Sequence, residues 1–204
     1  MSKATLFFLL LALFCIRIPF AMGETLRVSP EGMSLTEALA LAKDGDTVEL
    51  AEGTYAEPEE TFPLTVSHRV TICAAAGAQA VIDAPAFVAA LQIKADGVTL
   101  RDLTINMRRT GVRVSGNDFS MCNCAVILAD DSWRTSSCGV WLGGVYRASF
   151  TECSFTGCGL AMAGPPVSDA SKEKPMLTGL FEVGDDPAYF TSHTVKDCML
   201  SIIW

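Results

Sequence analysis

Four short stretches decide the fold of this chain: LRDLTI (100–105), FSMCNC (119–124), FTECSF (150–155) and VKDCML (195–200). Each starts on an apolar residue, passes through two other residues to Leu or Cys, and ends on an apolar residue or Cys. A second unit follows each of the first three: GVRVSG (111–116), GVWLGG (139–144) and GLAMAG (159–164). This alternation is an internal repeat, the sequence signature of a solenoid.

The geometry of β-strands indicates how the repeat folds. Apolar residues two positions apart face one side of a strand. The intervening pair, such as Arg101-Asp102, indicates a tight corner, and the glycine before each second strand allows a bend that a Cβ would hinder. One rung cannot bury its apolar face alone, whereas stacked rungs can. We therefore predict an all-β parallel β-helix, with loops inserted at corners near residues 129–137 and 165–190.

The first 23 residues have the features of a signal peptide. Lys3 supplies the basic start, residues 6–18 are almost all apolar, and Ala21 and Gly23 are the small residues before a cut at Glu24. We expect residues 24–204 to be one exported domain, periplasmic or extracellular. That part has no other apolar run of about 18 residues, so no membrane span is expected in it.

One helix is predicted, over residues 34–43. Ser34 is an N-cap candidate, Glu37 completes a capping box, and Gly45 is a stop signal. Terminal repeats of a solenoid need covering, so we expect this helix to cap the first rung.

The charge of the chain argues against two classes of binding partner. The formal net charge is −8, and no Lys/Arg cluster is interleaved with aromatic residues. Phosphate binding needs positive charge, so nucleic acid and anionic membrane surfaces are not expected partners.

The N-terminal half resembles the pectin-lyase-like superfamily. The predicted helix followed by GDTVELAEGTY (45–55) is similar to the opening of those proteins. PLTVSHRVTI (63–72), VID (81–83) and GVTLRDLTI (97–105) resemble the first rungs of NosD-like and related carbohydrate-binding or sugar-hydrolase β-helices. The resemblance covers about residues 25–164 and implies a right-handed parallel β-helix. It says little about function, because this fold carries lyases, hydrolases, esterases, adhesins and binding proteins.

The catalytic motifs of polygalacturonases and pectinesterases are missing, which favours a non-catalytic glycan-binding or structural role without a cofactor. The alternatives are a polysaccharide lyase or glycoside hydrolase, and a NosD-like accessory for copper or other metals. For catalysis the candidates are Asp130, Asp131 and Arg113, although hydrolysis needs two carboxyl groups placed across the bond.

A carbohydrate site is predicted on the second unit. Its central residue points outward between two inward ones, and down the rungs this position is Arg113, Trp141 and Ala161. Tryptophan rings stack on sugars while Arg and carboxylates bond hydroxyls. The predicted ligand-binding residues are Arg113, Asp130, Asp131, Trp133, Arg134 and Trp141. The plain alternative is that the inserted loop simply buries Trp141.

The chain has eight cysteines, and loss of Cys15 with the signal peptide leaves seven. Cys122, Cys153 and Cys198 share the repeat phase of Leu103, while Cys138 and Cys158 share another phase. Residues of one phase stack about 4.8 Å apart. The options are an interior ladder of thiols or disulfides between rungs, with Cys138–Cys158 the preferred pair.

The sequence contains two candidate ion sites, one for copper and one for calcium. Met121, Cys122 and Cys124 offer the soft ligands of Cu(I), although inward packing explains the cysteines as well. A corner column is expected at Asp102, Met121, Glu152 and Asp197. Outward acids there indicate a solvated surface rather than calcium, which takes six or more oxygen ligands.

The C-terminal stretch CMLSIIW (198–204) ends within a predicted strand. An open solenoid end leaves strand groups unpaired. We expect that the chain is a piece of a longer β-helix, that Trp204 packs back on the end, or that a partner or second copy covers it.

Overall fold

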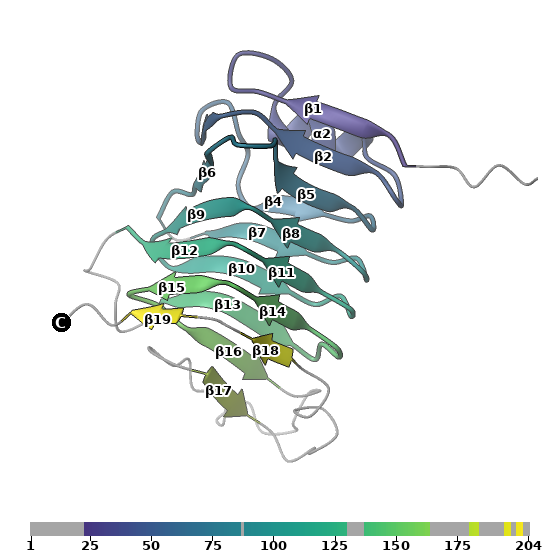
Figure 1. Cartoon of the computed structure of the whole chain (residues 1–204). Helices are drawn as coiled ribbons and strands as arrows, with labels where there is room; N and C mark the ends of the chain where they lie inside the picture. The colour runs from purple at the N-terminus through teal and green to yellow at the C-terminus, as the bar shows by residue number, and fades with distance from the viewer. Residues whose placement is uncertain are drawn as a thin grey trace, which may run out of the picture.

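The structure is a computed structural model that describes residues 23–86, 88–129, 137–163, 180–183, 194–196 and 199–201. The described strands form three parallel sheets, stacked as a solenoid of about five turns (Figure 1). Between residues 47 and 163, successive strands along the chain pass from sheet A to sheet B to sheet C, and each pairs with the strand one turn away. This arrangement confirms the predicted parallel β-helix.

Sheet A follows the order β1 (Thr25–Val28), β2 (Thr47–Leu50), β5 (Thr71–Ala74), β8 (Thr99–Arg101), β11 (Ser120–Cys122), β14 (Ser149–Thr151) and β18 (Thr194–Lys196). Sheet B contains β3 (Gly53–Tyr55), β6 (Ala80–Asp83), β9 (Leu103–Met107), β12 (Ala125–Leu128), β15 (Ser154–Thr156) and β19 (Met199–Ser201). Sheet C contains β4 (Leu64–Val66), β7 (Ala89–Ile93), β10 (Thr110–Val114), β13 (Cys138–Gly143), β16 (Leu160–Ala163) and β17 (Leu180–Val183).

The helix α2 (Leu35–Leu41) lies at the N-terminal end of the stack, where it contacts β1, β2 and β4 (Figure 1). The predicted capping box is present, since the Ser34 side chain accepts from Glu37 N and Glu37 accepts from Ser34 N. The sequence did not reveal a second anchor. The buried Glu60 carboxylate accepts from Leu35 N and Thr36 N at 2.7 and 2.8 Å. It therefore satisfies N–H groups that the first helical turn leaves without partners.

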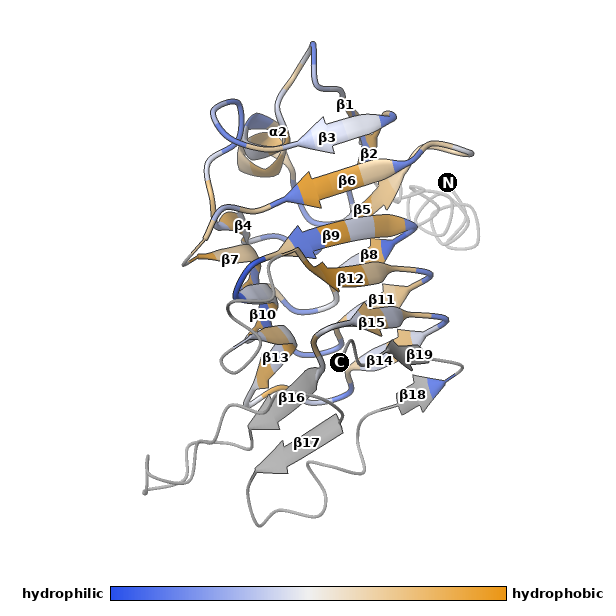
Figure 2. Cartoon of the chain, turned by 90° about the vertical axis from the view of Figure 1, so that its left-hand side faces the viewer, coloured by the Kyte–Doolittle hydropathy of each residue, from blue (hydrophilic) through white to orange (hydrophobic). Residues whose placement is uncertain are grey.

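The core is a set of columns of apolar side chains, one residue per turn. In sheet A the inward column is fully buried and consists of Val48, Ile72, Leu100, Met121 and Phe150. Figure 2 shows the corresponding hydrophobic colouring along β6 and β12 of sheet B. Phe119 lies beneath the column, with its ring centroid 5.9 Å from that of Phe150. The described part of the chain contains no helix that meets the length and apolarity of a membrane span.

The alignment of one repeat was wrong by two residues. Leu100 pairs with Met121, and Met121 pairs with Phe150, so Phe119 is not in this column. The corner column correspondingly contains Asn123 in place of the predicted Met121. Met121 is therefore buried instead of outward, and Cys122 lies outside instead of inside. The apolar pattern did not expose the error because Phe119 and Cys122 fit it in one register and Met121 and Cys124 fit it in the other.

The glycines of the second unit are explained by close approach between turns. A Cβ on Gly111 would lie 2.4 Å from the Gly139 carbonyl oxygen and 3.0 Å from Val126. A Cβ on Gly139 would meet the Cys158 sulfur at 2.9 Å. The requirement is therefore space between adjacent rungs, in addition to the bend that was expected.

Candidate functional site

Two outward surfaces carry the chemistry of the described part of the molecule. The first, which we call the sheet C face, is the outward column Thr65, Gln92, Arg113 and Trp141. The second, which we call the corner hollow, lies where sheet A turns into sheet B. Its lining includes Ala78, Asp102, Asn123, Glu152 and Ser154.

On the sheet C face, the register brings Arg113 directly beside Trp141 on adjacent parallel strands. Gln92 is the neighbour of Arg113 on the other side. The flanking residues Val112 and Val114 point inward and are buried, so alternation along β10 holds Arg113 outward. This part of the prediction is confirmed as a placement: Arg113 and Trp141 are neighbours in one column.

The exposure of the pair suits a surface contact. Arg113 is exposed and Trp141 is half-buried. The indole lies toward Gly143, where a Cβ would come 3.3 Å from Trp141 Nε1. Among the described residues Arg113 makes no salt bridge. The face thus presents an aromatic ring next to a guanidinium whose donors remain available.

The other predicted site residues, Asp130, Asp131, Trp133 and Arg134, lie outside the described residues. They belong to the loop between Leu128, the end of β12, and Cys138, the start of β13. Their part in a binding or catalytic site stays a prediction.

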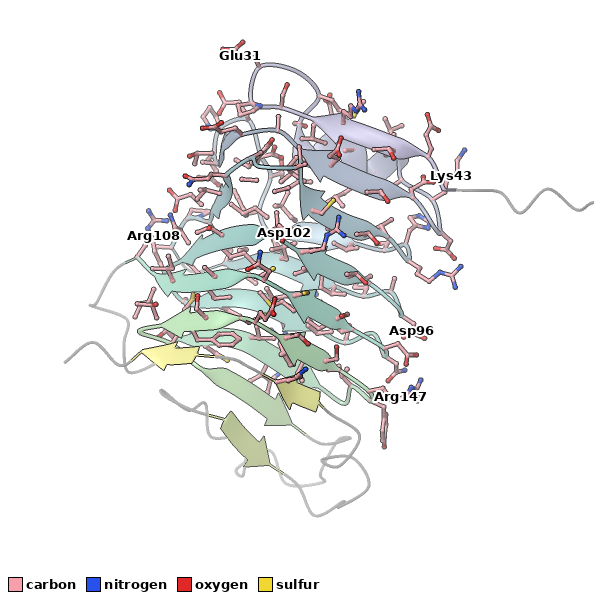
Figure 3. All side chains as sticks on the ribbon, in the orientation of Figure 1. Glu31, Lys43, Asp96, Asp102, Arg108 and Arg147 are labelled. Atoms are coloured by element: carbon pink, nitrogen blue, oxygen red, sulfur yellow. The ribbon has the colours of Figure 1, made fainter. Side chains whose placement is uncertain are left out.

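The corner hollow exists because the corners differ in length. Five residues, Ala75 to Gln79, join β5 to β6, whereas Asp102 alone joins β8 to β9. The lower corners at Asn123 and Glu152 are two residues long. The longer upper corner therefore overhangs the shorter ones and leaves a hollow of about 670 Å³. Figure 3 shows Asp102 midway across this side of the molecule, between Arg108 at one edge and Asp96 at the other.

Backbone conformation selects the residues of the lower corners. Asp102, Asn123 and Glu152 have φ angles of 60°, 50° and 55°. Short polar side chains, Asn and Asp above all, tolerate this left-handed region best among residues with a Cβ. Each corner N–H donates to the next turn, from Asp102 to Cys122 O, from Asn123 to Thr151 O and from Glu152 to Lys196 O. The three side chains are therefore stacked one turn apart.

The hydrogen bonds in the hollow leave some groups free for a ligand. Asn123 Nδ2 donates to Asp102 Oδ1 at 2.8 Å, and Arg101 Nε lies 3.2 Å from Asp102 Oδ2. The Glu152 side chain is exposed and makes no ion pair or hydrogen bond to any described residue. Polar and small apolar atoms thus share one concave surface.

The structure does not bring the predicted copper ligands together. Met121 and Cys124 point into the core, while Cys122 lies on the outer side of β11 beside Arg101. Burial raises the pKa of Cys124 to about 12, which disfavours the thiolate form that binds metal. No group of three or more His, Cys, Asp or Glu suited to a metal ion occurs in the described ranges. The inner Cys phase is that of Leu103, Cys124 and Cys153, so assigning Cys122 to it was wrong.

Cys138 and Cys158 are buried, and each thiol donates to a carbonyl, Cys138 to Val140 O at 3.0 Å and Cys158 to Val126 O at 3.5 Å. Burial and the neighbouring Cys138 raise the pKa of Cys158 to about 12. The structure holds the two residues as thiols, and the disulfide between them stays a prediction.

Two comparisons with known proteins found a match. A family model described as "Protein of unknown function (DUF1565)" matches residues 32–82. The chain itself folds as a parallel β-helix. This β-helix is also similar to a solved structure titled "a new PL6 alginate lyase complex with trisaccharide", at 22% identity and a TM-score of 0.46. That match covers 68% of this chain, which spans 33% of the length of the other. No curated protein matches the sequence.

Sequence reasoning missed the corner hollow for an identifiable reason. The β-helix repeats a polar residue directly before Leu103, Cys124 and Cys153, namely Asp102, Asn123 and Glu152. Aligning the repeats on that left-handed corner residue, instead of on the first apolar residue, would have found the correct register. The overhang itself depends on Ala75 to Gln79, whose fold over the corner no local pattern predicts.

Proposed function

We propose that this β-helix is a non-catalytic carbohydrate-binding protein that uses the sheet C face. The observation that supports the proposal is the register of Arg113 beside Trp141 on adjacent strands. An indole ring packs against the apolar faces of sugar rings, and a guanidinium donates to hydroxyl or carboxylate oxygens. Gln92 adds an amide on the next strand. These are the groups that orient a polar ligand on an extended surface.

The solenoid supplies the length of such a site. Adjacent strands are about 4.8 Å apart, so a chain of sugars running along the solenoid axis would cross one outward residue per turn. We propose that Asp130, Asp131, Trp133 and Arg134 extend the face, because their loop leads directly into β13, the strand of Trp141. The partner would be an oligosaccharide or a cell-surface polysaccharide.

The test measures binding to a panel of acidic and neutral oligosaccharides by Trp fluorescence and calorimetry. Trp141→Ala and Arg113→Ala should each weaken binding about tenfold, the usual loss for an aromatic or charged hydrogen-bonding contact. Thr151→Ala, an outward substitution on sheet A, is the matched control and should leave binding unchanged. Retained affinity in both site variants would show that the ligand, if any, binds elsewhere.

A catalytic role is the alternative, since Arg113 makes no salt bridge among the described residues and could act on an acidic sugar. Incubation with acidic polysaccharides separates the two functions. A binding protein leaves them intact, whereas a lyase produces new absorbance and a hydrolase new reducing ends. Product formation that disappears in Arg113→Ala would replace the binding proposal.

We propose that the protein is exported by cleavage before Glu24. Expression of the full chain and mass spectrometry of the mature protein test this. A mature N-terminus at Glu24 outside the cytoplasm is the expected result, and retention of an intact chain in the cytoplasm would contradict it.

A further inference from the structure

We propose that the corner hollow is a second binding site, for a small polyhydroxylated ligand that carries an ammonium group, such as an amino sugar. The hollow lies between sheets A and B, while the sheet C face belongs to the third side of the solenoid. The two sites are therefore separate surfaces, and this proposal does not depend on the function proposed for the sheet C face.

The overhang above the hollow is anchored at both ends, so the concave shape is a built feature. Ala75 N donates to Leu50 O at 2.8 Å, and Gly53 N donates to Gln79 O at 3.0 Å. Within the loop, Ala78 N donates to Ala75 O at 2.9 Å. Two bonds to the preceding turn and one within the loop hold the roof over the lower corners. A volume of about 670 Å³ is within the size range of small-molecule sites.

The floor of the hollow leaves space for a ligand because the outward column of sheet B has short side chains beneath the roof. Thr104, Ala125 and Ser154 follow one another on β9, β12 and β15, and all three are half-buried. The hydroxyl groups of Thr104 and Ser154 can donate and accept. Together with Ala76 and Ala78 of the roof, they combine hydrogen-bonding positions with small apolar patches, the mixture that a sugar ring presents on its own surface.

The corner side chains determine the charge that the hollow prefers. Asp102 is already engaged by Arg101 and Asn123, whereas the Glu152 side chain makes no hydrogen bond or ion pair to any described residue. Glu152 is thus an available acceptor at the lower end of the hollow, one turn below Asn123. An ammonium group satisfies this carboxylate, and the hydroxyls of the same ligand reach the amide and hydroxyl groups above it. A uronate would instead bring its carboxylate to the unpaired carboxylate of Glu152 and be repelled.

Calorimetry or NMR titration with glucosamine tests the site, with N-acetylglucosamine and galacturonate as matched sugars lacking the ammonium. We expect glucosamine to bind, N-acetylglucosamine to bind more weakly, and galacturonate not to bind. Glu152→Gln should weaken glucosamine about fivefold, the upper range for an exposed ion pair, and remove the preference over N-acetylglucosamine. Ala78→Phe fills the hollow from the roof and should abolish binding of both sugars.

The control variant is Trp141→Ala, which should not change glucosamine binding because Trp141 lies on sheet C. Circular dichroism and thermal denaturation of each variant establish that the fold is intact. The proposal is overturned if glucosamine does not bind in the millimolar range. It is also overturned if binding survives Glu152→Gln together with Ala78→Phe, or if binding is lost in Trp141→Ala and kept in folded Ala78→Phe.

Discussion

The sheet C face and the corner hollow come from the same repeat but obtain their chemistry in different ways. Arg113 and Trp141 stand at the centre of strands, where alternation holds a side chain outward without restricting its type. Asp102 and Asn123 stand at corners with positive φ, where the backbone itself favours short polar residues. A polar column at a corner is therefore first a consequence of folding, whereas an Arg–Trp pair on a strand has no such structural cause.

The largest effect on both surfaces is expected from conditions that destabilise the interior beneath them. Burial raises the pKa of Cys124 and Cys158 from 9.0 to about 12, and that of Tyr55 from 10.0 to about 12. Unfolding lets these groups ionise at lower pH than they do in the fold, so their stabilising effect is present below pH 9 and is lost between about pH 9 and 12. The melting temperature should fall steadily across this range. A flat profile from pH 8 to pH 11 would contradict the inward placement of the thiols.

The next largest effect is expected from removing one large side chain from the core. Phe150→Ala deletes a fully buried ring that packs on Phe119, and should lower the free energy of unfolding by about 3–5 kcal/mol. Its neighbour Thr151 points outward, so Thr151→Ala should change the free energy by no more than about 0.5 kcal/mol. Urea denaturation measures both. Equal losses would mean that the inward and outward columns are misassigned.

A substitution that crowds only one surface tests whether the two surfaces bind their ligands independently. Gly111→Ala places a Cβ 2.4 Å from the Gly139 carbonyl oxygen, beside the strands of Arg113 and Trp141. Overpacking of this kind costs about 1–3 kcal/mol, and it should weaken ligand binding on the sheet C face while glucosamine binding in the hollow remains. Gly77→Ala is the reverse case, because Gly77 lines the hollow and its φ of +77° strains any side chain, so it should weaken glucosamine binding and leave the sheet C face unchanged. Loss of both binding activities in Gly111→Ala would show that the two surfaces are not independent.

The smallest expected effect tests whether backbone conformation chose the corner residues. Glu152 has a φ of 55°, so Glu152→Asn should preserve or slightly raise stability, because Asn adopts this region readily. Glu152→Val should cost about 1–2 kcal/mol, since a branched side chain is strained there. Thermal denaturation of the two variants side by side is sufficient. Identical melting temperatures would remove the argument that the corner imposes polarity.

Much of the fold was predictable because it depends on local periodicity. The units around Gly111 and Gly139 align as expected, and the Ser34–Glu37 capping box is formed. The failure at FSMCNC (119–124) has a physical cause, because Phe119 and Cys122 in one register and Met121 and Cys124 in the other fit the apolar pattern equally well. Of the candidate site, the sequence predicted the pairing of Arg113 with Trp141 and missed the hollow under Ala75 to Gln79.

Periodicity and capping signals were sufficient to predict that apolar residues two apart would stack into a parallel β-helix, that one helix would follow an N-cap at Ser34, and that Arg113 and Trp141 would share a column. These features follow from alternation and capping, which act over a few residues. The three-dimensional structure was needed to show which residues of successive turns are paired. That pairing places Cys122 outside, Cys124 inside and Glu152 one turn below Asn123. Register between turns depends on contacts between residues more than 20 positions apart, and the lengths of the corners, rather than the strands, create the hollow.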